Sequence, residues 1–268
     1  MRKLKDKVAV VTGAAGGIGR ATALSLADAG CALALVDVDE VGLAATARSV
    51  EAKGQAVSAH VVSVADRAQM LALPAEVIAA HGAVHVLVNN AGVNMMTPFT
   101  EMALDDFDWV LGIDLMGVVH GCKAFLPHLL AADAAHIVNV SSMAALVGMP
   151  TQSAYCAAKA AVRAFSESLY TELGQTRVGV SCVMPGTTRT NILANGRASD
   201  PALHARLVGL MSRYAPGPER VARAIVRAIR QEEAQVMVCP DAHALAGLQR
   251  GSPALVRTAL RWLGGRVG

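Results

Sequence analysis

Strand-like runs alternate with helical stretches along almost the whole chain, and this alternation constrains the fold more than any other feature. The strand-like runs are rich in β-branched residues and lie at Val8–Thr12, Leu33–Asp37, Val57–Val62, Val86–Asn89, Ile137–Ser141, Val178–Met184 and Val236–Val238. Helical patterns separate them, at about 17–29, 40–53, 66–81, 103–131, 152–174 and 217–231. Several strands are apolar throughout, as in parallel sheets covered on both faces. The order predicts an α/β fold with one seven-stranded, mostly parallel, doubly wound sheet flanked by helices.

Nothing in the sequence divides the chain into separate units. With 268 residues, 53% of them hydrophobic, and no Pro/Ser-rich linker, residues 1–268 are expected to form a single domain.

Two regions interrupt the alternation of strands and helices. The long connection at about 187–216 lacks a strand pattern and is interpreted as a substrate lid. The tail at about 240–268 interleaves apolar residues with arginines and predicts an amphipathic helical extension. That helix is expected to pack on its own domain or on a partner subunit, with membrane contact as the minor alternative.

Composition and charge exclude several classes of function. Aromatic residues make up only 3% of the chain and the net charge of +3 is dispersed, so no nucleic-acid partner is expected. The eight histidines show no metal-ligand spacing, and no metal site is predicted. The five cysteines are widely spaced without a C-x-x-C motif, which favours a reducing, cytoplasmic location. No apolar run is expected to reach the length of a transmembrane helix.

A glycine-rich turn follows the first strand and precedes the first helix. Such a turn brings backbone N–H groups close to a pyrophosphate, and the helix N-terminus adds partial positive charge. Glycines at this spacing are a weak signal alone, and a turn without a ligand is the alternative. The residues expected to bind here are Gly13, Gly16, Gly17, Ile18 and Gly19.

An acidic residue ends the second strand. Asp37 lies twenty residues after Gly17, where a carboxylate accepts hydrogen bonds from both hydroxyls of an adenosine ribose. The same carboxylate repels a 2′-phosphate, and no Arg or Lys adjoins it in the sequence. The residue therefore favours NAD over NADP. A strand-end aspartate that caps the next helix is the alternative interpretation.

Three residues that suit proton transfer lie close together in the sequence. Tyr155 and Lys159 are four residues apart on a predicted helix and so project from the same face. A nearby ammonium favours phenolate, so the pKa of Tyr155 is expected to fall from the ordinary value of about 10. A tyrosine tuned in this way takes a proton from an alcohol or returns one to a carbonyl. Ser142 lies thirteen residues upstream. For the Tyr–Lys pair alone, an exposed pair on an ordinary helix is the more common structure.

With these motifs in place, residues 6–240 resemble the standard-length branch of the short-chain dehydrogenase/reductase family. The motifs occur in the family's order: Thr12-Gly13-x-x-x-Gly17-Ile18-Gly19, Asn89-Asn90-Ala91-Gly92, Ser142, Tyr155-x-x-x-Lys159 and Pro185-Gly186-x-x-x-Thr190. The resemblance implies a single-domain Rossmann fold and an NAD-dependent alcohol dehydrogenase or ketone reductase. It also implies further cofactor contacts at Val38, Ser63, Val64, Asn90, Ala91, Gly92, Tyr155, Lys159, Pro185, Gly186, Thr188 and Thr190.

The resemblance assigns a role to each matching residue. Tyr155 would be the acid/base, Lys159 would lower its pKa and bind the nicotinamide ribose, and Ser142 would hold the substrate oxygen. The sequence departs from the family pattern at two places. Asp114 stands where the family has an asparagine, so it is added to the catalytic set, and its carboxylate is expected either to hold Lys159 or to relay protons. Ser63 stands where an aspartate usually accepts a hydrogen bond from adenine.

The loops that line the family's substrate pocket are apolar in this chain. The expected substrate contacts are Ser142, Met143, Met149, Tyr155, Asn94, Met95 and Ile192. Methionines adapt to varied apolar ligands, so a steroid-like or medium-chain secondary alcohol or ketone is the expected substrate. An NADPH-type 3-oxoacyl reductase and a nucleotide-binding regulatory protein with weakened catalysis are the alternatives. The resemblance also implies a homo-oligomer paired through helices 103–131 and 152–174, with a tetramer ranked slightly above a dimer.

Overall fold

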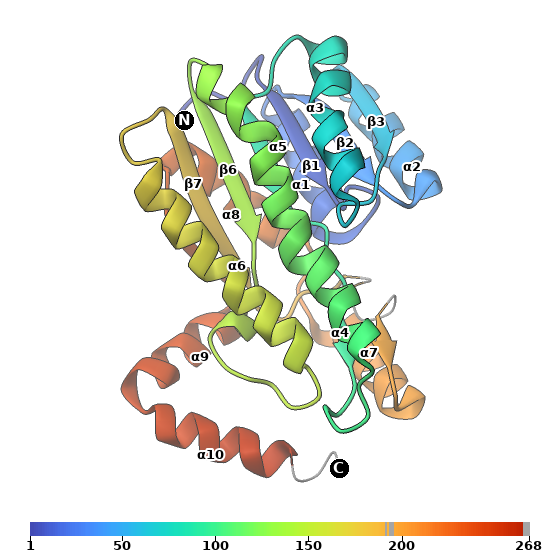
Figure 1. Ribbon diagram of the computed structural model, residues 1–268, viewed down its shortest axis with the longest axis vertical. Coiled ribbons are helices and arrows are strands. Elements are labelled where there is room, and N and C mark those ends of the chain that lie inside the picture. Colours follow the sequence, from blue (N-terminus) through green and yellow to red (C-terminus); the bar gives the residue numbers. More distant parts are fainter. Residues whose placement is uncertain (191, 193–195, 265–268) are drawn as a thin grey trace.

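The computed structural model describes residues 1–190, 192 and 196–264 of the chain. Part of the predicted lid, at 191 and 193–195, and the end of the tail, at 265–268, therefore lie outside the described residues. The described residues form one α/β unit built on a central sheet (Figure 1).

The central sheet has seven strands, as predicted, and every pairing in it is parallel. The strands follow the order β3-β2-β1-β4-β6-β7-β9. The prediction of a seven-stranded, mostly parallel, doubly wound sheet is thus confirmed, and the sheet is parallel throughout. The strand bounds are β1 Val8–Thr12, β2 Ala32–Asp37, β3 Val57–Val61, β4 Val86–Asn89, β6 Ala135–Val140, β7 Val178–Pro185 and β9 Gln235–Val238.

Helices cover both faces of the sheet and enclose a separate apolar core on each side. One face carries α1 (Gly17–Asp28), α2 (Glu40–Glu51) and α8 (Glu219–Gln231), and its core includes Leu26, Leu43 and Ile225. The other face carries α3 (Arg67–His81), α5 (Gly117–Ala131) and α6 (Ser153–Glu172), and its core includes Leu73, Phe125 and Val162. Because both faces are covered, the central strands β1, β4 and β6 are buried throughout, while the edge strand β3 is partly exposed.

The predicted helix at 103–131 is a single rod with a wider turn inside it. α4 (Leu104–Leu111) continues through a π-helical turn, Gly112–Met116, into α5. By length and composition alone this 28-residue rod is apolar enough to cross a membrane, contrary to the expectation that no apolar run reaches that length. Half of its most apolar window is buried within the protein, as in the core helix of a globular domain. The π turn also places the buried Asp114 inside the molecule.

The lid region contains more regular structure than its sequence indicated. The short strand β8 (Arg197–Ala198) pairs in parallel with β5 (Met95–Met96) and corrects the expectation that 187–216 lacks a strand. Hydrogen bonds from Arg197 N to Asn94 O and from Ser199 N to Met96 O extend the pairing. A helix, α7 (Pro201–Tyr214), follows.

The tail forms two helices rather than one. α9 (Pro240–Gly251) and α10 (Pro253–Gly264) lie beyond the carboxyl ends of the strands, next to the N-terminal end of α6 (Figure 1). Ser252, between them, has an extended φ of −152°. Proline disfavours the helical conformation in the residue before it, so Pro253 separates the two helices.

The strand order fixes where a ligand can bind. The chain runs from β1 outward to β2 and β3, then crosses back to β4 and continues outward in the other direction. The connections after β1 and β4 therefore diverge and leave a crevice at the carboxyl ends of these two strands.

Candidate active site

The glycine-rich turn lies at this crevice, between β1 and the start of α1. Gly13 and Gly17 have positive φ angles of +66° and +52°, a region that side chains disfavour. A Cβ on Gly19 would lie 1.9 Å from the carbonyl oxygen of Gly13, so the close approach requires glycine. No atom lies within 4 Å of the Cβ position of Gly16, which leaves open space beside the helix N-terminus. This cradle fits the pyrophosphate of a dinucleotide.

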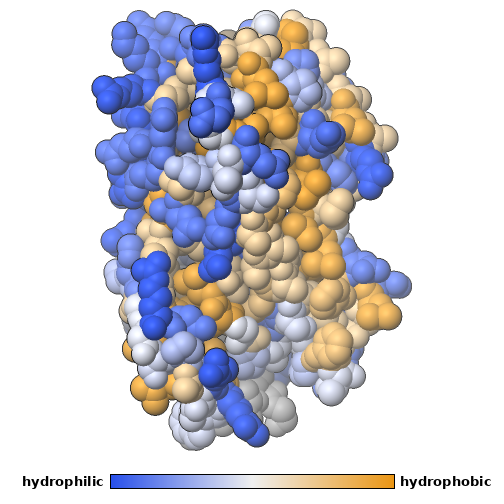
Figure 2. Space-filling view, turned by 60° about the vertical axis from the view of Figure 1, so that its left-hand side comes forward, coloured by the Kyte–Doolittle hydropathy of each residue, from blue (hydrophilic) through white to orange (hydrophobic). Residues whose placement is uncertain are grey.

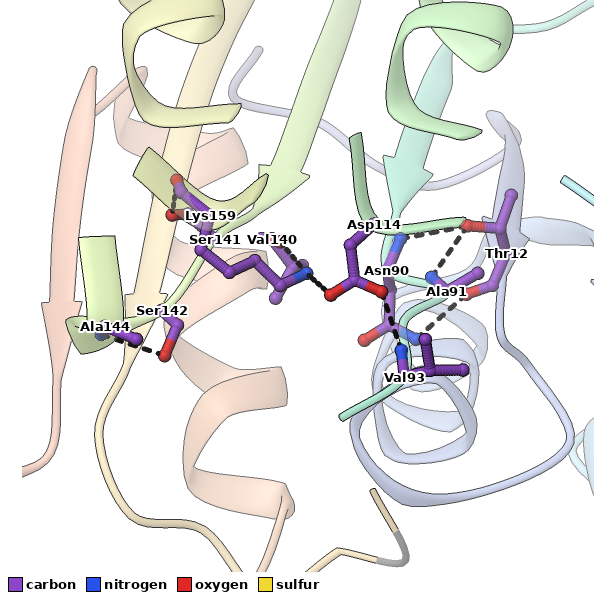
Figure 3. Close-up of polar contacts among 10 residues, drawn as sticks. All are labelled: Thr12, Asn90, Ala91, Val93, Asp114, Val140, Ser141, Ser142, Ala144 and Lys159. Carbon is purple, nitrogen blue, oxygen red and sulfur yellow. Dashed lines mark hydrogen bonds and ion pairs between the residues drawn. The ribbon is translucent and has the colours of Figure 1, made fainter. Parts of the chain in front are cut away.

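Hydrogen bonds tie the glycine-rich turn to the segment that follows β4. The hydroxyl oxygen of Thr12 accepts from the backbone N–H groups of Asn90 and Ala91, at 2.9 and 3.0 Å. The side-chain amide of Asn90 donates back to the carbonyl oxygen of Thr12 at 2.9 Å (Figure 3). A Cβ on Gly92 would lie 3.3 Å from Lys159 Nζ. The segment Asn90–Gly92 therefore joins the glycine-rich turn to the group around Lys159.

Asp37 is positioned by the turn that it faces. Its Oδ2 accepts from Ala15 N at 2.9 Å, and its Oδ1 accepts from Val38 N at 2.8 Å and from Asp39 N at 3.1 Å. The carboxylate is fixed at the edge of the glycine-rich turn. Its Oδ1 already accepts two hydrogen bonds, and its Oδ2 keeps a lone pair that is available to a ribose hydroxyl. Asp39, and not Asp37, caps the N-terminus of α2. This weakens the alternative interpretation, in which Asp37 is a helix-capping residue.

Ser63 and Val64 follow β3 at the same edge. Ser63 N donates to Gln69 Oε1 at 3.2 Å, and Val64 is buried, with its carbonyl oxygen 3.0 Å from His120 Nδ1. His120 is buried and joins its helix to this segment. The Ser63 side chain is half-buried.

The segment after β7 crosses the glycine-rich turn. The Cβ of Thr190 lies 3.3 Å from the position of a Cβ on Gly17, which brings the two predicted cofactor contacts together. Thr188 is buried, and its hydroxyl donates to Gly186 O at 3.1 Å. Pro185 ends β7.

Asp241, in the first turn of α9, holds this segment. Its Oδ2 accepts from Thr187 N at 2.7 Å, and a Cβ on Gly186 would lie 2.1 Å from its Oδ1. Sequence reasoning did not identify Asp241, because its contact is made only when the tail folds back on β7. Its position directly after Pro240, at a helix start, was the one available signal.

Ser142, Tyr155 and Lys159 come together at the carboxyl ends of β6 and β7, as their motif predicts. Tyr155 and Lys159 lie on the first turns of α6 and are both buried. Lys159 Nζ lies 5.6 Å from the centre of the Tyr155 ring. The Ser142 side chain accepts from Ala144 N at 3.1 Å, and its hydroxyl lies close enough to Tyr155 to lower the pKa of the phenol. The Ser141 hydroxyl, just after β6, donates to the Lys159 carbonyl oxygen at 2.8 Å and so ties α6 to the end of that strand.

A buried ion pair joins Lys159 to Asp114. Lys159 Nζ lies 3.0 Å from Asp114 Oδ2, and the two side chains are 3% and 0% exposed (Figure 3). Asp114 Oδ1 accepts from Val93 N at 2.7 Å, and Lys159 Nζ also lies 3.4 Å from Val140 O. Of the two roles expected for Asp114, the geometry favours the one that holds the ammonium.

These contacts overturn the expected direction of the Tyr155 pKa. The pKa of Tyr155 is raised above its ordinary value, first because burial disfavours the phenolate. The Lys159 ammonium and the Ser142 hydrogen bond oppose this rise, while the Asp114 carboxylate adds to it. Burial lowers the pKa of Lys159, but the Asp114 carboxylate and Tyr155 together with smaller contributions raise it, and the net pKa of Lys159 is raised. Lysine therefore stays charged, and Asp114 offsets part of its effect on the tyrosine.

Some of the predicted substrate contacts lie close to Tyr155 and others do not. Met95, Met149 and Ile192 belong to the same apolar cluster as Tyr155. Asn94 is buried beside them, and its carbonyl oxygen is bound to the lid through Arg197 N. Met143 lies on the short 3₁₀ turn Met143–Ala145 after Ser142 and is half-buried outside that cluster.

A second contact that sequence reasoning missed fastens the lid to α4. The guanidinium of Arg197 stacks 3.9 Å from the centre of the Trp109 ring and hydrogen-bonds to Asp106 at 2.5 Å. No sequence pattern linked these positions, because β8 and α4 approach each other only in the folded chain.

Comparison with known proteins defines the family. The family model described as short chain dehydrogenase matches residues 7–201. The candidate oxidoreductase SadH of Mycobacterium tuberculosis is 40% identical over 254 residues, which cover 93% of this chain and 92% of SadH. The 3-oxoacyl-[acyl-carrier-protein] reductase FabG of Thermotoga maritima is 31% identical, over 87% of this chain and 94% of FabG.

A solved structure shows the same architecture. A short chain dehydrogenase/reductase from Burkholderia phymatum, crystallised in complex with NAD, superposes with a TM-score of 0.88 and 34% identity. The match covers 95% of this chain and 96% of that protein. The chain therefore belongs to the short-chain dehydrogenase/reductase family of oxidoreductases.

Proposed function

We propose that the protein is an NAD-dependent oxidoreductase that interconverts an apolar secondary alcohol and its ketone. The observation that carries this proposal is the position of Tyr155. Its phenol is buried in an apolar cluster, close to Ser142, beside the Lys159 ammonium and next to a crevice shaped for a dinucleotide.

Asp37 supports NAD as the cofactor. Its carboxylate is held on the glycine-rich turn and suits ribose hydroxyls, and a 2′-phosphate there would meet a negative charge. The Burkholderia relative crystallised with NAD agrees with this choice. The remaining dinucleotide contacts are proposed for the other predicted residues around the crevice, with Thr190 close to Gly17.

The chain's own residues account for the proton transfer. Bound NAD supplies the hydride acceptor for oxidation and, when reduced, the hydride donor for reduction. In the oxidation direction, Tyr155 Oη takes the proton of the substrate hydroxyl, and Ser142 Oγ holds the substrate oxygen. Lys159 favours the phenolate form, and the buried site excludes water from the proton transfer. In the reduction direction, the same phenol returns the proton to the carbonyl oxygen.

The walls near Tyr155 support an apolar substrate. The cluster around the phenol contains Met95, Met149 and Ile192, and methionine side chains adapt to apolar ligands of different shape. We propose medium-chain or steroid-like alcohols as the substrate class.

A panel of alcohols tests the proposal. Aliphatic alcohols, steroids and hydroxy acids are incubated with NAD⁺, and reduced cofactor is followed by absorbance. We expect turnover of apolar secondary alcohols, and replacement of Tyr155 by phenylalanine should lower kcat by roughly 10²–10⁴-fold because the proton acceptor is removed. A Tyr155→Phe variant with full turnover would contradict the assigned role. Absence of turnover across the panel, with NAD bound, would instead favour a nucleotide-binding regulatory protein.

One relative favours a specific second candidate. The identity to the reductase FabG supports a 3-oxoacyl reductase, which would use the same tyrosine in the reduction direction. The position of Asp37 disfavours the NADPH that the alternative assumes. Turnover of an acetoacetyl thioester with NADH and with NADPH distinguishes the two functions.

We also propose a cytoplasmic homo-oligomer. All five cysteines are buried and unpaired, which suits a reducing compartment.

A further inference from the structure

A cavity of about 690 Å³ separates the catalytic loop from the C-terminal tail. One wall is the loop around Leu146 and Met149, and the opposite wall is α10, with Val256 and Leu260. A volume of this size suits a small ligand. Val256 is buried against the cavity, so the tail helix has an apolar side turned toward the body of the protein.

The cavity adjoins the position of the reacting tyrosine. Met149 lines it and also belongs to the apolar cluster of Tyr155. Met149 N lies 3.3 Å from the sulfur of Cys156, the residue after Tyr155. An apolar ligand that reacts at the phenol can therefore extend along Met149 toward the tail.

Two arginines of α10 line the cavity. Arg257 and Arg261 are one helical turn apart on α10, and both line the cavity. Within the ranges that the structure describes, neither forms an ion pair with a carboxylate. Like charges at this spacing destabilise a helix, and an anion between them would remove the repulsion. Arginine also binds carboxylate and phosphate groups through paired hydrogen bonds.

A polar side chain also lines the cavity. Gln249 lines the cavity from α9, and its side-chain oxygen has no hydrogen-bond partner among the described residues. Rotation of this amide toward a ligand therefore breaks no hydrogen bond at that oxygen. The lining of the cavity thus combines apolar, polar and cationic side chains.

We propose that this cavity binds the distal end of an anionic amphiphile, a substrate with an aliphatic body and a terminal carboxylate or phosphate group. The aliphatic body lies along Met149 and Leu260, and the anionic group pairs with Arg257 and Arg261. This inference rests on the proposed function, because the alcohol or keto carbon of the same molecule reacts at Tyr155.

A binding titration that needs no turnover tests the inference. The full chain, saturated with NAD⁺, is titrated with 11-(dansylamino)undecanoic acid and with its uncharged methyl ester, and dansyl fluorescence is read. Charge-assisted hydrogen bonds predict that the acid binds about tenfold or more tightly than the ester. The double variant R257Q/R261Q should lose that preference. The matched control is R250Q, which changes a tail arginine outside the cavity wall and should keep the preference.

Competition then links the cavity to the catalytic site. The acid should raise the KM for 2-decanol oxidation without lowering kcat, and this effect should be absent in R257Q/R261Q. Equal binding of acid and ester, an unchanged preference in the double variant, or inhibition that leaves KM unchanged would each overturn the inference. A preference for the acid together with no oxidation of any alcohol would overturn the proposed function and leave the anion site supported.

Vesicles distinguish a free amphiphile from a lipid headgroup. The protein is sedimented with phosphatidylglycerol vesicles and with phosphatidylcholine vesicles. We expect little binding to either at physiological ionic strength. Sedimentation that requires phosphatidylglycerol and both arginines, without preference for the free acid, would overturn the inference in favour of membrane contact.

Discussion

Asp114 is the residue that most changes the electrostatics of the site. An asparagine of the same shape would accept the hydrogen bond from Val93 N without carrying charge. The carboxylate instead pairs with Lys159 at 3.0 Å and contributes to the raised pKa of Tyr155. In the proposed alcohol oxidation the phenolate accepts the proton, so we expect the pair to set the pH range of activity.

Replacement of Asp114 by asparagine should move the pH–rate profile. The variant removes a charge that raises the pKa of Tyr155, so that pKa falls. The phenolate then forms at lower pH, and the rising limb of kcat/KM for alcohol oxidation should shift to lower pH. The measurement is kcat/KM from pH 6 to 10. The control D108N, on the exposed side of α4, should leave the profile in place, and the same profile in D114N would show that the carboxylate has no influence.

Asp37 should govern the choice between cofactors. In a D37N variant the amide keeps the shape but loses the charge that favours ribose hydroxyls and repels a 2′-phosphate. A hydrogen bond to a charged group contributes about 1.5–3 kcal/mol, so KM for NAD⁺ should rise roughly tenfold or more. The ratio of kcat/KM for NAD⁺ to that for NADP⁺ should fall. The adjacent variant D39N should keep the ratio, because Asp39 caps α2, and an unchanged ratio in D37N would remove Asp37 from cofactor choice.

The residue types in the site were predictable, but their mutual influence was not. The motifs identified Tyr155, Lys159 and Ser142 because short spacings and an ordered set of segments carry the signal. The direction of the Tyr155 pKa was predicted wrongly, because burial and the contact with Asp114 arise only in the folded chain. Asp241 was missed for the same reason.

At the scale of elements, the lid is held by Arg197. Its backbone joins β8 to β5, and its side chain reaches Trp109 and Asp106 on α4. These contacts place Asn94 and Met95 of the predicted substrate loop under the lid.

Replacement of Arg197 by alanine should loosen the lid without disturbing the dinucleotide crevice. An exposed ion pair and a cation–π contact each contribute up to about 1 kcal/mol. The KM for the alcohol should therefore rise roughly threefold to tenfold, while the KM for NAD⁺ stays unchanged. Steady-state kinetics with each substrate varied in turn provides the measurement. R206A, on the exposed surface of α7, is the control, and an equal rise in both KM values would argue for general destabilisation instead.

Long helices and strands were predictable from the sequence, and the shortest strands were not. The seven sheet strands lie within two residues of their predicted bounds, because each has at least four residues and most are rich in β-branched or other apolar residues. β5 and β8 have two residues each, too few for any periodicity, and they pair only through the tertiary fold. The break at Pro253 was visible in the sequence as a proline within an amphipathic pattern, yet the interrupted helix was read as continuous.

At the scale of the whole molecule, part of the surface is unusually apolar. Figure 2 brings forward the side on which α6 lies and shows a band of apolar surface along the molecule. On α6 itself, Ala157, Ala160 and Ala164 are exposed at helical spacing, next to the half-buried Phe165. Small residues let two helices approach closely, so this face suits the predicted pairing of α6 with its copy.

An arginine at Ala164 should disrupt that pairing. A long charged side chain there would have no room between closely packed helices and no partner for its charge. We expect the mass measured by size-exclusion chromatography with light scattering to fall to a smaller species, a monomer from a dimer or a dimer from a tetramer. The control A52R, at the end of α2 on the far edge of the sheet, should keep the native mass. A native mass for A164R as well would exclude α6 from the interface.

The wide π turn at Gly112–Met116 has a consequence for how this protein tolerates change. A π turn holds one more residue than an α-helical turn, so removal of one residue here would restore regular winding while α4 and α5 keep the faces they bury. Val110 and Phe125 would stay in the interior, and the residues inside the turn, Asp114 among them, would change position. A single-residue deletion in this turn should therefore keep the fold and disturb chiefly the Asp114–Lys159 pair.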